Sequence, residues 1–524
     1  MPRYKPTDYA QTRLIPLALA DQLQPGTLEY AIHYLLEERL DLSVFDQRYA
    51  NDATGRAAYN PRVLLKVILL GYARGLLSSR QLERACRENV LFMALAGEQT
   101  PDHSTLATFI SSVQTEVPAL FTQVLLVCEQ EGLLGGTHFS LDGVKLPSNA
   151  AKECSGTFAD LRVKQQALQR KVQEALQQHH AADQQDESGG SAGRDPRGGD
   201  RVPLVVPARV ARLQRQAERI EQFLATHEPR RGRSGREVQS NVTDNDSGKL
   251  VSAHGVVQGY NANALVAQGH QVVVYAEAFG QGGDEEHVAP MLAGAQRHLE
   301  ALGRPAAWHG RQLSADTSYY SLTNLQACEQ AGVDAYIPDP KFRKRDVRFA
   351  AAGRHRRSVD KHKQRYRSKR RWFGPRDFQP DRARGGLLCP AGKRLYRNGT
   401  GMVDAKGYRV SSFRSLARDC DGCELRAKCL RHPHPGATRQ VRLFHGRVPG
   451  SLTAAMKAKI DTPAGRARYG QRLGIVEPVF ANIRARKRMD RFTLRGRAKV
   501  NVQWQLYCLV HNLEKLAKYA PCWN

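Results

Sequence analysis

The sequence has no long run of apolar residues. Its longest such stretch, VLLKVILLGYA at 63–73, is well short of the roughly 20 residues that a membrane-spanning helix requires. The first 22 residues also have no continuous apolar segment of the signal-peptide kind, because Asp, Gln and Pro interrupt them. We therefore expect a soluble, cytoplasmic protein without a membrane partner.

Acidic residues are scarce relative to basic ones. Lys and Arg total 79 and Asp and Glu total 51, so the formal net charge at pH 7 is 79 − 51 = +28. Such an excess of one sign repels itself unless an anionic partner is present. A nucleic acid fits this role best, ahead of a membrane surface or an acidic protein, and would place the protein on the nucleoid.

The ten cysteines stand in a chain without a secretory signal, so we expect reduced thiols or metal ligands and no disulfide framework. Four of them, around a Cys-x2-Cys core, are candidate zinc ligands: Cys389, Cys420, Cys423 and Cys429. Four thiolates suit tetrahedral Zn²⁺. His432 and His434 are substitute ligands, and buried, reduced thiols are the alternative.

A chain of 524 residues is too long for one hydrophobic core, because such cores stop growing near roughly 250 to 300 residues. The patterns predict a helical N-terminal domain at 1–132, an α/β domain at 133–340 with a helical insertion at 151–240, a basic and Cys-rich insertion at 341–450, and the rest of the α/β domain at 451–524. Within the first insertion, two long helices at 157–178 and 207–226 are joined by a polar link.

The N-terminal domain contains three helical patterns, of which the third begins with Ser78-x-x-Gln81, the spacing of a capping box. One helix of such a domain can enter a DNA major groove. A structural or dimerising role agrees with the pattern equally well.

Two strand patterns end near an aspartate. GGTHFSLDGVKL alternates in the manner of a strand and reaches Asp142, and RQLSADTSYY brings Asp316 to the end of another. Strands at 259–268 and 271–280 form a hairpin between them, followed by a helix. Strands alternating with helices predict a mixed α/β sheet covered on both faces.

Phosphodiester cleavage by two metal ions needs acidic oxygens that converge from different elements. Asp142 and Asp316 meet this requirement, although a single Asp at a strand end is more often a turn or cap residue.

Three stretches resemble the insertion-sequence transposases of the DDE superfamily: FSLDGVKLPSNA around Asp142, LSADTSYYS around Asp316 and YGQRLGIVEPVFANIRARK around Glu477. The last is similar to the family's signature of tyrosine, arginine, glutamate and a basic residue. Here the signature contains Tyr469, Arg472 and Glu477, and then Arg484 and Lys487. PRVLLKVILLGYARGLLSSRQLE and PDHSTLATF resemble the helical N-terminal domain of one branch of that family, and NVTDNDSG with GYNANALV resembles its segment after the first acid.

The resemblance implies an RNase H-like mixed sheet flanked by helices. It further implies that Asp142, Asp316 and Glu477 hold two Mg²⁺ or Mn²⁺ ions. Tyr469 and Arg472 would lie near DNA phosphates, and Arg484 or Lys487 would contact the cut end. Pro478 directly follows Glu477, which places the acid at a helix start or a bend, and the alternative is that it only stabilises a helix N-terminus.

The segment 341–376 contains 16 Lys or Arg and two acids, interleaved with Phe342, Tyr366, Trp372 and Phe373. Rings can stack on bases and cations can bind phosphates, so this density predicts DNA contact, although a charged run can also be solvated surface. The candidate contacts that we name in it are Arg356, Arg370 and Arg371.

The predicted function is that of a DNA transposase that cuts element ends and joins them to target DNA, as a homodimer in the synaptic complex. Two alternatives remain. One is a non-catalytic DNA-binding protein derived from such an enzyme, and the other is an RNase H-like nuclease or resolvase. His287 and Asn261 also lie in stretches that resemble the family, but a lone His or Asn is more often structural, so neither is assigned to the triad.

Overall fold

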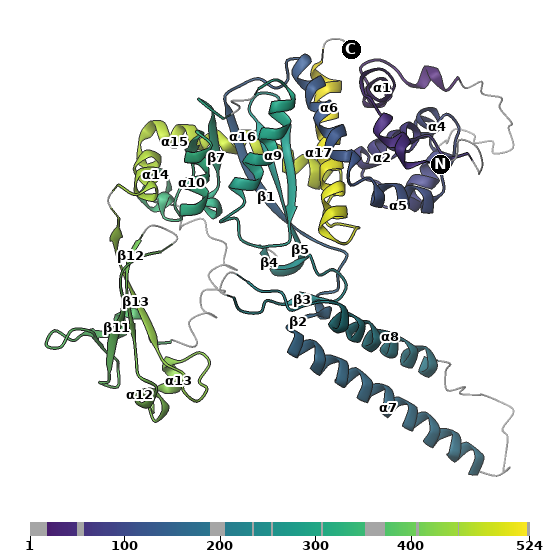
Figure 1. The fold of residues 1–524 in the computed structure, drawn as a ribbon. Helices are drawn as coiled ribbons and strands as arrows, with labels where there is room; N and C mark the ends of the chain where they lie inside the picture. Colours follow the sequence, from purple (N-terminus) through teal and green to yellow (C-terminus); the bar gives the residue numbers. More distant parts are fainter. Residues whose placement is uncertain are drawn as a thin grey trace, which may run out of the picture.

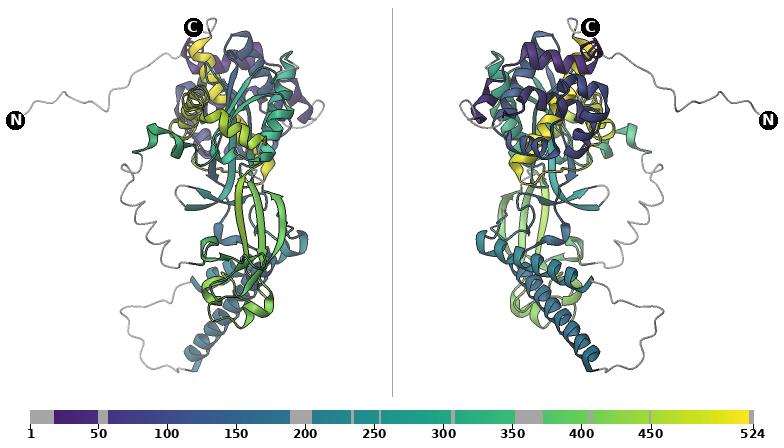
Figure 2. Two further views of the ribbon diagram at one scale, coloured as in Figure 1. Left: turned by 90° about the vertical axis from the view of Figure 1, so that its left-hand side faces the viewer. Right: turned by 90° about the vertical axis from the view of Figure 1, so that its right-hand side faces the viewer.

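The computed structural model describes residues 18–49, 57–188, 205–232, 235–252, 255–304, 308–351, 372–404, 408–448 and 450–520. They form a body of helices around a sheet, from which a helical hairpin and a separate small sheet extend (Figure 1). Figure 2 shows the same two extensions from the sides. Among the described residues, no single helix is long and apolar enough to cross a membrane. Two consecutive helices, His103–Ser112 and Glu116–Gln130, reach the required length and apolar composition only when taken together, and they are bent by 80° relative to each other.

The N-terminal region is helical, as predicted. Its helices are α1 (Leu28–Tyr34), α2 (Pro61–Ala73), α3 (Ser79–Glu88), α4 (Val90–Ala96), α5 (His103–Ser112) and α6 (Glu116–Gln130). The Ser78 side chain accepts a hydrogen bond from the Gln81 backbone nitrogen, and the Gln81 side chain accepts one from the Ser78 backbone nitrogen. The predicted capping box is therefore present. Tyr72 of α2 stacks on Tyr507 near the C-terminus with ring centroids 4.4 Å apart. The helical region therefore shares one continuous core with the sheet.

The central sheet is mixed. Its strands are β1 (His138–Pro147), β4 (Gly248–Ser252), β5 (Gly255–Ala267), β6 (Val273–Phe279), β7 (Gln312–Ala315) and β8 (Asp334–Tyr336). β5 pairs antiparallel with β1, β4 and β6, while β7 runs parallel to β1 and β8 parallel to β7. The order β4-β5-β1-β7-β8, with β6 also on β5, puts the two predicted aspartate strands side by side.

Helices cover both faces of this sheet (Figure 1). Those that follow its strands are α9 (Val288–Ala301) and α10 (Leu322–Gln330), and those near the C-terminus are α14 (Leu452–Asp461), α15 (Pro463–Gly470), α16 (Arg472–Ala481) and α17 (Arg497–Tyr519). Phe480 of α16 stacks on Trp504 of α17, whose Nε1 donates to the Asn263 carbonyl of β5. The predicted fold class, a mixed α/β sheet flanked by helices with a helical N-terminal region, is confirmed.

β1 differs from the prediction in length. It continues past Asp142 to Pro147, because its pairing with β5 extends from Phe139 to Pro147. Asp142 therefore lies within a strand and not at its end. The two strands approach closely enough that a Cβ on Gly259 would lie 2.0 Å from the Leu146 carbonyl oxygen.

The two extensions have different structures. The first is a pair of long helices, α7 (Phe158–Ser188) and α8 (Val205–Thr226), with the short strands β2 (Ser155–Gly156) and β3 (Ser240–Asn241) at its base. The second is a sheet in the order β13-β12-β11-β10-β9, in a region where no regular structure was predicted. Its elements are β9 (Gln379–Pro380), β10 (Leu387–Leu388), β11 (Arg394–Val403), β12 (Tyr408–Arg414), α12 (Ala417–Asp421), α13 (Arg426–Cys429) and β13 (Gln440–Arg447). Both extensions have small cores of their own.

Candidate active site and cysteine cluster

Asp142 lies in β1, and Asp316 directly follows β7, the strand parallel and adjacent to β1. Leu141 of β1 is in register with Ala315 of β7, and each aspartate is the next residue along its strand direction. Both side chains line one cavity of about 640 Å³. The structure thus brings together two of the three predicted carboxylates.

Asp142 is half-buried and ion-paired. Arg472 Nη1 of α16 donates to Asp142 Oδ2 at 2.9 Å. Burial raises the pKa of Asp142 above its ordinary value of 3.8; the Arg472 guanidinium opposes the rise and the Asp316 carboxylate adds to it. The two carboxylates are thus close enough to repel each other, as expected of a pair that shares a cation.

Asp316 is fixed by the turn that follows β7. Its Oδ1 accepts from the Ser318 backbone nitrogen at 2.8 Å and from Ser318 Oγ at 2.5 Å. This local pattern is that of an aspartate capping a short helix, here Thr317–Tyr319. Asp316 both caps this short helix and lines the cavity, so the turn orients its carboxylate toward the cavity.

Glu477 is not brought to the same place. It is exposed in the interior of α16, with Pro478 after it inside the same helix. Of the two predicted positions, a helix start or a bend, the helix start is therefore wrong. It is not among the residues that line the cavity, whereas Arg484, seven residues later, is. Its role as the third carboxylate remains a prediction.

Two further carboxylates, which were not among the predicted triad, also line the cavity: those of Asp284 and Asp490. Asp490 is exposed and Asp284 is buried. Burial acts to raise the pKa of Asp284, but contacts with His287, Ser318 and Asn261 outweigh it and leave the pKa below 3.8. Asp284 is therefore ionised at neutral pH.

The donor set of this cavity suits a hard cation, because carboxylate oxygens dominate it. Nevertheless, as the side chains stand, no three His, Cys, Asp or Glu residues in the described part of the chain are grouped so as to hold a metal ion. A complete site therefore needs a third side chain to turn toward Asp142 and Asp316.

The other residues of the predicted signature have mixed placements. Tyr469 is partly buried, with its ring edge-on to Phe342 at 5.3 Å, and burial raises its pKa. Arg472 forms an ion pair with Asp142, and its side chain is largely buried instead of lying on an open surface. Lys487 is fully buried, with Nζ 2.6 Å from Glu514 Oε2, so the DNA contact that we predicted for it does not fit this position.

The basic segment is described only in part. Arg356, Arg370 and Arg371 lie outside the described residues. Near its start, Arg345 forms ion pairs with Asp339 and Asp461 and so anchors the chain. Phe342 is buried against Tyr469, so its ring is not open to bases. Phe373 is partly buried against the small sheet, and its stacking on bases stays a prediction.

The four predicted zinc ligands line one small cavity in the second extension: Cys389, Cys420, Cys423 and Cys429. Burial raises the pKa of the Cys429 thiol; Arg439 opposes the rise, and the other three sulfurs add to it. Lys393 donates its backbone N–H to Cys389 Sγ at 3.3 Å. His432 and His434 are exposed and do not line this cavity.

Two family models match the chain. A transposase DDE domain matches residues 388–517, which include Glu477 and the cysteine cluster, and a transposase domain (DUF772) matches residues 17–112. No curated protein matches the chain significantly. Among solved structures, a piggyBac transposase synaptic complex with hairpin DNA, determined by cryo-EM, is similar at 10% identity and a TM-score of 0.30, over 94% of this chain and 74% of that chain.

Proposed function

Because the two matched domains indicate an insertion-sequence transposase of the DDE class, a polynucleotidyl transferase, we propose that this chain cuts DNA at the ends of a mobile element and joins the cut ends to target DNA. The observation that carries the proposal is the convergence of Asp142 and Asp316 in one cavity, from neighbouring parallel strands. Carboxylates that meet in this way are what phosphodiester chemistry with divalent cations requires.

The residues that would hold the cations are Asp142, Asp316 and Glu477. Bound Mg²⁺ or Mn²⁺, two ions per site, would supply Lewis-acid stabilisation of the charge on the scissile phosphate. The role of Glu477 as a cation ligand is supported by the sequence resemblance. It is also supported by the position of α16, because Arg472 of the same helix donates to Asp142. The proposed contact of Arg484 with a DNA phosphate is supported by its exposure at the cavity.

The proposed partner is double-stranded DNA, both as element ends and as target. The net charge of +28 supports it, because lysine and arginine bind phosphates and release counterions. Bringing two ends together requires two active sites, so we propose a homodimer in the synaptic complex. We place the protein in the cytoplasm, on the nucleoid.

We also propose one structural Zn²⁺ at the cysteine cluster. The support is that four thiols from separate parts of the second extension line one small cavity. Four thiolates are a sufficient ligand set for zinc. The small apolar core of this extension gives a reason for a metal, because a short segment with little apolar content gains folding energy from one.

The test uses the purified full-length protein, Mg²⁺ and labelled duplexes that tile the DNA flanking its gene. Nicks at one fragment boundary together with joined products are the expected result. Nicks without joined products would favour the nuclease or resolvase alternative. Binding without either product would favour the non-catalytic DNA-binding protein. Omitting Mg²⁺ and adding a chelator is the matched control for metal dependence.

A further inference from the structure

The sheet of the second extension has one covered face and one open face. Side chains along a strand alternate between the two faces of a sheet. Phe413 of β12 and Val441 of β13, which are in register, lie in the small core beside two of the cluster cysteines. The even-numbered positions of β12, from Tyr408 to Arg414, therefore lie on the other face, which we call the open face.

Three large apolar side chains stand exposed on the open face. The strand register places Tyr396 of β11 opposite Arg414. It places Met402 of β11 and Phe444 of β13 on either side of Val410. Tyr396 is 41% exposed, Met402 44% and Phe444 58%. Exposed apolar side chains that gather on one face mark an interaction site, whereas single scattered ones do not.

Two contacts fix the orientation of side chains on the open face. The rings of Tyr408 and Phe444 are perpendicular, with centroids 6.3 Å apart. Arg414 Nε donates to Thr438 Oγ1 at 2.8 Å. Side chains that are already held lose less conformational freedom when a ligand binds, so this face is pre-organised.

The charge around the open face has one sign. The strands β11, β12 and β13 contain six arginines and no Asp or Glu. Two of these arginines, Arg414 and Arg442, lie on the open face by register and are exposed. An anionic partner complements this charge, whereas the same face of a second copy would bring like charges together.

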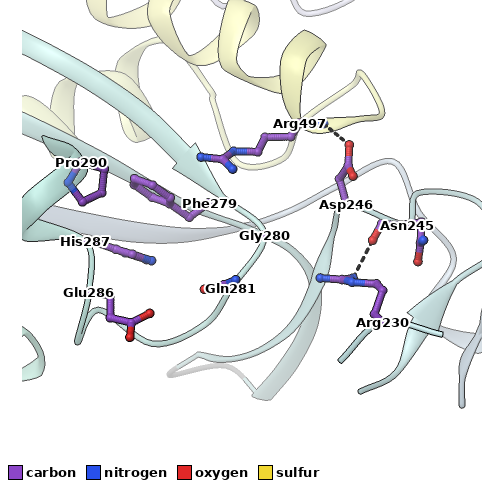
Figure 3. Close-up of a pocket in the computed structure, with 10 residues that line it drawn as sticks. All are labelled: Arg230, Asn245, Asp246, Phe279, Gly280, Gln281, Glu286, His287, Pro290 and Arg497. Carbon is purple, nitrogen blue, oxygen red and sulfur yellow. Dashed lines mark hydrogen bonds between the residues drawn. The ribbon is translucent and has the colours of Figure 1, made fainter. Parts of the chain in front are cut away.

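The open face differs from an arginine–aromatic cluster in the α/β body. At the end of β6, Phe279 lies between His287, with ring centroids 4.0 Å apart, and Arg497, 5.3 Å from the ring centroid (Figure 3). Phe279 is only 7% exposed, so its ring has no room for a further stacking partner. The rings of Tyr396 and Phe444 keep that room.

We propose that the open face binds the unpaired nucleotides of single-stranded DNA. Bases inside a duplex are stacked on one another, whereas unpaired bases are free to stack on exposed aromatic side chains. Tyr396 and Phe444 stack on bases, and Arg414 and Arg442 bind the phosphates between them. This binding goes beyond the proposed function, because it needs no cleavage and no duplex. It rests on that function only in the choice of DNA over RNA.

Binding of the full-length protein to labelled oligothymidine of about 20 nucleotides, measured by fluorescence anisotropy in EDTA, tests the proposal. An abasic strand of equal length has the same phosphates without bases, so the ratio of the two affinities reports stacking alone. We expect the wild type to bind oligothymidine roughly five- to 100-fold more tightly than the abasic strand. The double variant Tyr396→Ala, Phe444→Ala should bring this ratio close to one.

Two arginine variants separate charge from stacking. Arg442→Gln should weaken binding to both strands by the same factor and leave the ratio unchanged. The matched control is Arg409→Gln, because Arg409 is exposed on the opposite face of β12. It should change neither affinity. Equal effects of Arg442→Gln and Arg409→Gln would overturn the role of the open face.

Three other results would also overturn the proposal: a wild-type ratio near one, a wild-type ratio kept by the double variant, and tighter binding to oligouridine of equal length. A kept ratio with a changed oligomeric state would mark the face as a protein contact. Should the double variant fail to fold, the wild type is photocrosslinked to a strand with iododeoxyuridine. Crosslinked peptides with Tyr396 or Phe444 are expected, and crosslinks at other sites alone would refute the assignment.

The binding result is independent of the proposed active site, because EDTA prevents metal-dependent cleavage. Loss of the stacking preference would leave the convergence of Asp142 and Asp316 untouched. Absence of cleavage in Mg²⁺ would leave the preference for oligothymidine over the abasic strand standing. The two proposals can therefore fail separately.

Discussion

Arg472 and Asp142 are 330 residues apart in sequence, and their side chains form a direct ion pair of 2.9 Å between Nη1 and Oδ2. The arginine side chain is 9% exposed and the aspartate 20%, so the pair is largely shielded from water. It joins α16 to the central strand of the sheet. The C-terminal segment is therefore built into the same site as the first predicted acid.

Breaking this pair is expected to reveal strong coupling. Arg472→Ala leaves a half-buried carboxylate without its partner and should lower the free energy of unfolding by about 1 to 3 kcal/mol. Asp142→Asn in the same chain removes the unpaired charge, so the double variant should lose less than the sum of the two single variants. Urea unfolding of the wild type, the two single variants and the double variant measures this coupling as a double-mutant cycle. Additive losses would contradict a direct interaction.

The stability of the fold is expected to fall in mild acid because of His511. Burial in α17 lowers the pKa of His511 from its ordinary 6.5 to about 3. The folded state therefore keeps His511 neutral, while the unfolded chain binds a proton below pH 6.5. This contribution to stability is fully present above pH 6.5 and is lost as the pH falls toward 3, by about 1.4 kcal/mol per pH unit.

The variant His511→Gln isolates this effect. Between pH 7 and pH 5, the wild type should lose about 2 kcal/mol more unfolding free energy than the variant. Urea unfolding at both pH values provides the comparison. Equal losses in the two proteins would mean that His511 is not held neutral in the folded state.

Zinc is expected to leave when one ligand is removed. The wild type, purified without chelator, should contain about one Zn²⁺ per chain, and Cys423→Ser should lose most of it and melt at a lower temperature. Cys328→Ser is the matched control, because Cys328 is a buried thiol outside the cluster. A zinc content near zero in the wild type would refute the proposed site.

The basic segment is expected to set the salt dependence of DNA binding. Changing Arg354, Arg356, Arg357, Arg370 and Arg371 together to Gln removes five charges while sparing Arg345, which is paired with Asp339 and Asp461. The slope of log affinity against log salt should then flatten by up to about 4 units. An unchanged slope would mean that the segment is solvated surface.

The strands that bring Asp142 and Asp316 could be predicted from the sequence, because the alternation of apolar residues is a local signal. That the two aspartates converge was implied only by the resemblance and by the needs of two-metal chemistry, since the parallel pairing of β1 with β7 is a long-range contact. Helix α16 was also predictable, but how it is rotated against the sheet was not. That rotation depends on tertiary packing, such as Phe480 on Trp504, and it leaves Glu477 exposed. Lys487 shows the same limit, because a basic residue in a signature gave no sign that Glu514 holds it in the core.

Two other features gave weaker signals. The β9–β13 sheet was missed because β9 and β10 are only two residues long and β11 is largely exposed, with Leu395 as its single buried position, so no alternation of apolar residues marks these strands. Asp284 was missed because it follows a strand by several residues in a glycine-containing loop. Its place at the cavity depends on contacts with Asn324 and Asn261, which are distant in sequence.

The most direct test of the central claim is the cleavage and joining of a labelled element-end duplex in Mg²⁺ by carboxylate variants. Asp142→Asn, Asp316→Asn and Glu477→Gln keep side-chain size but remove the charge that a hard cation requires. We expect each to abolish both products while DNA binding persists, and any one change to cost nearly as much as all three. Near wild-type cleavage by Glu477→Gln alone would transfer the third position to another acid, with Asp490 and Asp284 at the cavity as the first candidates. Near wild-type cleavage by Asp142→Asn would contradict the active site itself.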